Sequence, residues 1–235
     1  MAYSFQVVEE KLQEADYFLC LLQSTKPLSF ESRCYFSAFV SASRSVTFAL
    51  QFSMHGIPNF ECWYTKAQER LRTDALAPHF KEMRNDMQKK GVNPLNQVPV
   101  EHLKEHLTRQ LTESIYGHVM VIPHPTQKGN TVLVDALNAC SDYFNSLVSL
   151  IYDAYSEFKY DVDPQWYYTR ERFEAKGRSF LDAVVELGFP PELANAAPNE
   201  DEGWHVLRLQ QPPCALNSMF YAYLGKIIEP PTQLV

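Results

Sequence analysis

Apolar side chains recur every three or four positions through the first part of the chain, which is the spacing of one face of an α-helix. Four stretches of this kind follow one another, at residues 5–22, 30–54, 59–71 and 76–90. Ser29 precedes the second stretch in a position that suits an N-cap, and Gly91 ends the fourth. Thr73 or Asp74 is placed to cap the fourth helix. Because the connections are short, residues 1–92 are expected to form an up-and-down four-helix bundle.

The remaining residues, 93–235, alternate between helical and β-prone patterns. We expect a helix from Val100 to Leu111, strands at Ile115–Ile122 and Thr131–Val134, a helix from Leu137 to Phe158, a helix opened by Asp163-Pro164 and ended at Gly188, an acidic loop at 199–202, a strand at Trp204–Leu209 and a helix at Asn217–Ile227. The sequence therefore predicts a mainly α protein with a small β element. The second part is expected to pack as a helical extension on the same globule.

The overall charge narrows the classes of function. The chain of 235 residues carries a formal net charge of −7, which argues against a surface that binds nucleic acid along its whole extent but leaves room for a local basic site.

The eight glycines of the chain are scattered and form no phosphate-binding loop, so no cofactor is predicted. No run of about 18 apolar residues occurs, so no membrane span is predicted.

The cysteine pattern bears on the compartment. The five cysteines, at positions 20, 34, 62, 140 and 214, are odd in number, and no two of them are close in sequence. This pattern predicts reduced, buried thiols, as is usual in a cytoplasmic protein.

Polar residues on the fourth predicted helix are the main candidates for a site. Arg84 lies about 70° from the centre of the apolar stripe formed by Phe80 and Met83, where a solvated polar face is the ordinary interpretation. The alternative is an anion site, because a guanidinium fork matches phosphate. Asn85 would add a donor and an acceptor, and Lys89 would add charge.

The order of these residues resembles a family motif. Arg84-Asn85, three variable positions, then Lys89 and Gly91, on the last of four helices, resemble the HEPN family of small all-helical proteins that handle nucleotides and RNA. Active members carry a His where this chain has Lys89, and paired copies cut RNA across a dimer interface. The resemblance implies a HEPN-like bundle, a homodimer, and a role in defence or in a toxin–antitoxin-like setting.

The departure at Lys89 changes the expected activity. An unperturbed imidazole exchanges protons near neutral pH, whereas an exposed lysine stays charged up to a pKa of about 10.4. Metal-independent RNA cleavage needs that proton transfer. We therefore expect a non-catalytic protein that binds RNA, a nucleotide or a protein partner through Arg84, Asn85 and Lys89. The alternatives are an active ribonuclease that uses Arg84 with an atypical partner, and a helical scaffold without a ligand.

Three other groups of residues have an ordinary and a functional interpretation. His102 and His106 flank Glu105 in a short zinc-protease-like pattern, but the neighbouring apolar residues describe a plain amphipathic helix, and no metal site is predicted. Four arginines, at positions 33, 44, 70 and 72, either extend a phosphate-binding strip or pair with glutamates. The rings at 166–168 either stack on bases or belong to the core.

Overall fold

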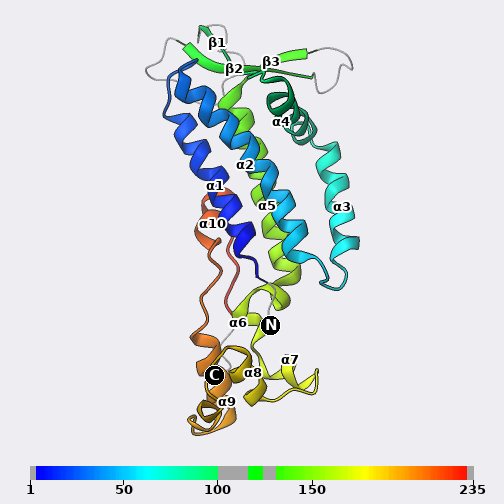
Figure 1. Ribbon diagram of the computed structural model, residues 1–235, viewed down its shortest axis with the longest axis vertical. Helices are drawn as coiled ribbons and strands as arrows, with labels where there is room; N and C mark the ends of the chain where they lie inside the picture. Colours follow the sequence, from blue (N-terminus) through cyan, green and yellow to red (C-terminus); the bar gives the residue numbers. More distant parts are fainter. Residues whose placement is uncertain (1–3, 100–115, 124–130, 232–235) are drawn as a thin grey trace. The chain divides into compact units, whose positions relative to one another are not determined.

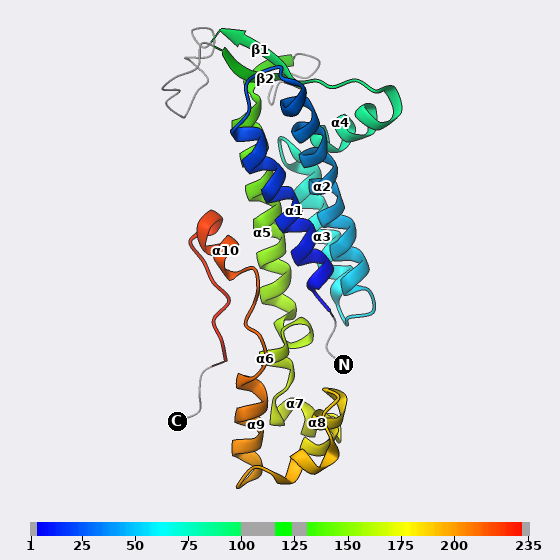
Figure 2. The same ribbon diagram turned by 60° about the vertical axis from the view of Figure 1, so that its left-hand side comes forward.

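The computed structural model describes residues 4–99, 116–123 and 131–231. Its contacts divide the chain into two compact units. The N-terminal unit comprises residues 7–148, and the C-terminal unit comprises residues 1–6 and 149–235. The boundary expected at residue 92 falls inside the N-terminal unit. Figures 1 and 2 show two views of the chain.

The N-terminal unit is built on long helices. Helix α1 (Gln6–Gln23) buries one seam, and α2 (Phe30–Met54) buries residues on several sides, as the small residues along it predict. Ser29 caps α2, since its hydroxyl accepts a hydrogen bond from the Ser32 amide. Helices α1, α2 and the first part of α5 (Ala136–Val162) run side by side (Figures 1 and 2).

Two shorter helices complete the helical part of this unit. Helix α3 (Phe60–Thr73) precedes α4 (Ala77–Lys90). Asp74 lies between the two helices, at the C-cap of α3, and its Oδ1 accepts hydrogen bonds from the amides of Leu76 and Ala77 at the start of α4, at 2.8 Å each. Gly91 ends α4 at φ +68°, a conformation that glycine adopts without strain.

Aromatic rings form the centre of the N-terminal core. The rings of Phe80 and Tyr143 stack with centroids 4.4 Å apart, and the Phe39 ring meets those of Phe80 and Phe144 edge-on. These four residues come from α2, α4 and α5, so the ring-rich composition is used to join three helices.

A three-stranded antiparallel sheet belongs to the same unit. Its order is β1 (Asn96–Pro99), β2 (Tyr116–Pro123), β3 (Thr131–Asp135), with Val119 of β2 opposite Asn96 on one side and Asp135 on the other. Strands β2 and β3 confirm the predicted β element. Strand β1 was not predicted, because its four residues contain Pro99 and show no alternation.

The C-terminal unit contains the end of α5 and a set of short helices. These are α6 (Pro164–Tyr167), α7 (Arg170–Glu174), α8 (Phe180–Glu186), the 3-10 helix η2 (Pro191–Asn195), α9 (Glu200–Leu209) and α10 (Asn217–Leu224). A cluster of buried side chains holds α6 to α9 together and comprises Tyr167, Tyr168, Phe173, Phe180, Ala183, Val184, Trp204 and Leu207. Tyr167 and Tyr168 thus belong to the core rather than to a base-stacking surface.

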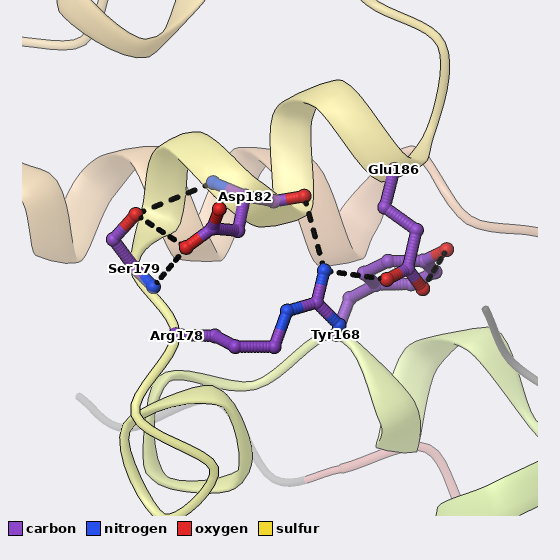
Figure 3. Close-up of polar contacts among 5 residues, drawn as sticks. All are labelled: Tyr168, Arg178, Ser179, Asp182 and Glu186. Atoms are coloured by element: carbon purple, nitrogen blue, oxygen red, sulfur yellow. Dashed lines mark hydrogen bonds and ion pairs between the residues drawn. The ribbon is translucent and has the colours of Figure 1, made fainter.

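Polar contacts fix α8 at both ends (Figure 3). Ser179 and Asp182 form a reciprocal capping box, with the Ser179 amide donating to Asp182 Oδ2 at 2.7 Å. Arg178 Nη2 lies 2.6 Å from Glu186 Oε2, and the Tyr168 hydroxyl donates to Glu186 Oε1 at 3.4 Å. The polar face of α8 is therefore tied down, while its apolar residues remain available for packing.

Several sequence-based expectations in this unit were wrong. The single helix expected from Asp163-Pro164 to Gly188 is divided into α6, α7 and α8, because turns at 168–169 and 175–179 interrupt it. The acidic loop at 199–202 is the cap and first turn of α9, where Asn199 accepts from the Glu202 amide. The strand expected at Trp204–Leu209 is the rest of that helix. The N-cap and the burial of Trp204 and Leu207 on one helix face outweigh the β-prone composition of this segment.

The cysteines are all free, but they are not all buried. Cys140 and Cys214 are buried as expected, whereas Cys20, Cys34 and Cys62 are exposed. The last three lie on the outer sides of their helices, beside rather than within the apolar stripes.

Candidate anion-binding site

A cavity of about 220 Å³ opens among four helices of the N-terminal unit. It is lined by three cationic side chains, several uncharged polar ones and no carboxylate. The lining residues are Arg44, Thr47 and Gln51 of α2, Tyr64, Gln68, Leu71 and Arg72 of α3, Ala77, Pro78 and Lys81 of α4, and Tyr143 of α5.

Helical spacing explains how these residues converge. Arg44, Thr47 and Gln51 are separated by three and four positions, so they share one face of α2. The lining residues of α3 and α4 follow the same intervals. The polar faces of α2, α3 and α4 therefore converge on one cavity. Tyr143, whose ring stacks on that of Phe80, belongs to the lining of this cavity.

Arg44 is held in place within this cavity. Its Nη1 donates to the Thr47 hydroxyl at 2.9 Å, and its Cζ lies 4.3 Å from the centroid of the Phe48 ring. A guanidinium that is half-buried and stacked on a ring is pre-ordered, so little side-chain entropy is lost when it binds an anion.

The other two cations are not neutralised by neighbours. Within the described residues, neither Arg72 nor Lys81 makes an ion pair. Both side chains are exposed at the mouth of the cavity. The site therefore presents two uncommitted positive charges beside an ordered one.

Two tyrosine hydroxyls line the same cavity. Burial raises the pKa of Tyr143 to about 12, although the Arg44 charge opposes that shift. Burial also raises the pKa of Tyr64, whose hydroxyl donates to the Thr47 carbonyl at 3.3 Å. Both phenols stay neutral near neutral pH, so they can donate hydrogen bonds but do not serve as bases.

Asp74, an acidic residue near the cavity, is engaged in other hydrogen bonds. Asp74 raises the pKa of Tyr143 and is therefore close, but it does not line the cavity. Its Oδ1 caps α4, and its Oδ2 accepts from the Ser146 hydroxyl at 3.2 Å. The carboxylate is thus occupied by hydrogen bonds rather than by Arg44, Arg72 or Lys81.

The residues singled out by the HEPN-like motif occupy other positions on α4. Arg84 is half-buried, and its Nη1 donates to Asn85 Oδ1 at 3.3 Å, while its buried Nε has no hydrogen-bond partner. Lys89 is exposed and lies five residues on, about 140° around the helix from Arg84. Arg84, Asn85 and Lys89 do not line the cavity.

The four arginines for which a phosphate-binding strip was one interpretation do not all lie together. Arg44 and Arg72 line the same cavity, whereas Arg33 and Arg70 are exposed and do not line it.

His102 and His106 lie outside the described residues. Among residues 4–99, 116–123 and 131–231, no group of three or more His, Cys, Asp or Glu side chains is placed to hold a metal ion. None of the helices in those ranges is long and apolar enough to cross a membrane.

A second polar cavity, of about 500 Å³, lies in the C-terminal unit, and its charges compensate one another. Arg170 Nη1 lies 2.5 Å from Asp201 Oδ1, and its Nε lies 2.7 Å from Glu174 Oε1. Arg170 is thus paired twice, and the second arginine of the lining, Arg208, shares the cavity with the carboxylates of Glu171, Asp201 and Glu202. This cavity is therefore a weaker anion site than the one around Arg44, whose lining holds no carboxylate.

A family model described as Bacteriophage lambda protein ea47 matches residues 7–157, well over half of the chain. The chain belongs to the ea47 family. All the lining residues of the basic cavity fall within the part shared with the ea47 family, while helices α6 to α10 follow it. No curated protein and no solved structure matches the chain.

Sequence reasoning missed part of this site. Lys81, Tyr64 and Tyr143 were not assigned to it, because each lies on a different helix and looks ordinary in its own stretch. The available signal was the pairing of Arg44 with Arg72 as candidate phosphate ligands. The missing information was which faces of α2, α3 and α4 meet.

Proposed function

We propose that this member of the ea47 family is a non-catalytic binding protein that holds one phosphate group of an RNA or nucleotide in the cavity of Arg44, Arg72 and Lys81. The observation that carries the proposal is a cavity with three cations and no lining carboxylate. Charge-assisted hydrogen bonds from such groups are about twice as strong as neutral ones. The volume, about 220 Å³, suits a single phosphate rather than a whole nucleotide.

The absence of a general base in the lining supports binding over cleavage. The lining contains no His, Cys, Ser or carboxylate, and the pKa of Tyr143 is about 12. Proton abstraction near neutral pH needs a group whose pKa lies near the working pH. We extend the proposal to a HEPN-like ancestry, supported by Arg84, Asn85 and the Gly91 cap on α4, and to a role in defence or a toxin–antitoxin-like setting.

The test compares binding of a short 5′-phosphorylated RNA with that of its dephosphorylated form, by fluorescence anisotropy. The double variant Arg72→Gln Lys81→Gln is expected to bind the phosphorylated RNA at least about tenfold more weakly, since it removes two charge-assisted contacts. Lys89→Gln is the matched control, because it removes an exposed lysine of the same helix outside the cavity. Its affinity should stay within about twofold of the parent.

Four outcomes would overturn this assignment. Equal binding by the double variant and the parent would remove the cavity from the site. A loss confined to Arg84→Ala and Lys89→Gln would return the site to the motif residues of α4. Cleavage of the RNA by the unaltered protein would establish the ribonuclease alternative, and no difference between the two RNAs would favour a scaffold without a ligand.

We also propose a homodimer, as the HEPN resemblance implies. Phe48 and Phe52 lie one turn apart on α2, and Phe52 is 80% exposed. Burial of Phe52 in a dimer would contribute roughly 1.5–3 kcal/mol, and burial of Phe48, which is 49% exposed, about half as much. Sedimentation velocity should show a dimer for the parent and a monomer for Phe52→Asp, whereas a monomeric parent would refute the proposal.

A further inference from the structure

The C-terminal unit carries an apolar groove that the proposed phosphate site does not explain. It has a volume of about 430 Å³ and lies among α8, η2 and α9. Its large apolar lining residues include Phe180, Val184, Phe189, Leu193, Val206 and Leu207. Phe189, Leu193 and Val206 are exposed large apolar side chains. Apolar surface gathered in a groove in this way is typical of a binding site rather than of scattered surface residues.

The floor of the groove is part of the unit's own core. Phe180, Val184 and Leu207 are buried members of the cluster that joins α8 to α9. Gly203 lets the two helices approach, because a Cβ at that position would lie 2.8 Å from Phe180 Cζ. The groove is therefore formed by packed helices and exists without a ligand.

The contacts in Figure 3 add to this rigidity. Asp182 and Glu186 are one turn apart on α8 and are held by Ser179 and Arg178 on the side opposite Val184. With its polar face fixed, α8 keeps Phe180 and Val184 directed toward the groove. A preformed groove loses little entropy when a ligand binds.

The segment of the chain that forms the groove is acidic, and one of its carboxylates, Glu202, lines the groove. Residues 180–210 contain six acidic residues and one arginine. Asp182, Glu186 and Asp201 are engaged with Ser179, Arg178 and Arg170.

The other three acidic residues are Glu192, Glu200 and Glu202. They make no ion pair within the described residues, and Glu202 itself lines the groove. Glu202 in the groove, with Glu192 on η2 and Glu200 at the start of α9, favours a ligand that has an apolar stripe and flanking positive charges.

We propose that this groove binds a basic amphipathic helix of a partner protein. Apolar side chains at helical spacing fill the groove between Val184 and Val206, while lysines or arginines beside that stripe pair with Glu192, Glu200 and Glu202. This mode of recognition lays one apolar helix face into a groove and selects partners by the charge of the rim. The inference is independent of the phosphate site, because it uses none of the residues of that cavity.

The experiment uses the full-length protein and three labelled synthetic peptides of about 18 residues. The first has leucines at helical spacing with lysines between them, the second has glutamates in place of the lysines, and the third has the first composition in scrambled order. Anisotropy titrations should give an affinity for the first peptide at least about tenfold higher than for the other two. Equal binding of the acidic or the scrambled peptide would overturn the proposal.

Matched variants locate the binding. Val206→Asp places a charge in the groove and should weaken binding of the basic peptide at least about tenfold. Leu209→Asp is its control, because Leu209 is 56% exposed on the same helix, against 49% for Val206, and does not line the groove. Glu192→Gln Glu202→Gln should weaken binding and reduce its salt dependence. Unchanged peptide binding by Val206→Asp would refute the site. A parent protein that is dimeric and a Val206→Asp variant that is monomeric would also refute the proposal, because a second copy of the chain would then cover the groove.

Discussion

At the scale of single residues, His79 shows how burial sets a pH response. It lies on α4, and its buried Nε2 has no hydrogen-bond partner. Desolvation lowers its pKa below the usual 6.5, although Glu82 opposes the shift. The unfolded chain therefore binds the proton more readily than the folded one, and protonation favours unfolding.

This shift predicts that the free energy of unfolding falls as the pH drops through 6.5 toward the lowered pKa of His79, and is fully regained above 6.5. Urea denaturation at a series of pH values should show that His79→Gln flattens this part of the profile. His55→Gln is the control, since the His55 side chain is 83% exposed. An identical slope in His79→Gln and in the parent would contradict the prediction.

Residue chemistry was predictable from the sequence only in part. Ser29 and Gly91 could be assigned to helix ends, and the start of α4 could be narrowed to Thr73 or Asp74, because capping depends on local spacing. The convergence of Arg44, Arg72 and Lys81 could not, because it depends on which helix faces meet.

At the scale of elements, α4 depends on one side chain from outside it. Asp74 Oδ1 accepts hydrogen bonds from two amides at the start of α4, and its Oδ2 accepts one from the Ser146 hydroxyl of α5. We expect Asp74→Ala to lower the free energy of unfolding by about 1–2 kcal/mol, because a cap and a hydrogen bond between elements are lost together.

Asp74→Asn keeps an acceptor oxygen and should retain most of that stability. Chemical denaturation of both variants would measure the difference. Asp86→Ala serves as the surface control, since its ion pair with Lys90 is exposed and should contribute less than about 1 kcal/mol. A loss for Asp86→Ala as large as for Asp74→Ala would show that charge, rather than capping, explains the effect.

Element types could be predicted where the pattern is long and could not where it is short. Helices α1, α2 and α5 have 18, 25 and 27 residues, and their stripes are unambiguous. Helix α9 has ten residues, and its large apolar residues, Trp204, Val206, Leu207 and Leu209, all lie from position 204 onward, where the composition favoured a strand. The division of residues 164–186 into three short helices depends on contacts with the aromatic cluster. The apolar periodicity of this segment alone does not reveal those contacts.

At the scale of the whole molecule, the negative charge is concentrated in one unit. The C-terminal unit has 13 acidic and seven basic residues, a net charge of −6, while the N-terminal unit has 15 and 14, a net charge of −1. The phosphate site thus belongs to a nearly neutral unit and the acidic groove to a strongly acidic one. This separation suits two ligands of opposite charge.

The same distribution predicts how RNA affinity depends on length and salt. Because one cavity takes one phosphate and the unit that carries it has a net charge of only −1, lengthening a 5′-phosphorylated RNA should add little affinity. The slope of log affinity against log salt should be about −1 or shallower, as expected when roughly one phosphate is neutralised. Titrations at several salt concentrations with RNAs of increasing length would check both, and a steep, length-dependent slope would indicate an extended binding track instead.

The close approach of Gly203 to Phe180 has a consequence for how this unit can change over time. A Cβ at 203 would lie 2.8 Å from Phe180 Cζ and 3.4 Å from the Ala197 Cβ, so a larger residue there collides with a ring that other core residues hold. A loss of ring volume at position 180 would relieve the collision, so the two substitutions compensate each other in the sense of a double-mutant cycle. Relatives that keep this unit should therefore show coupled replacement of the pair: an aromatic residue at 180 with glycine at 203, or a smaller side chain at 180 with alanine at 203.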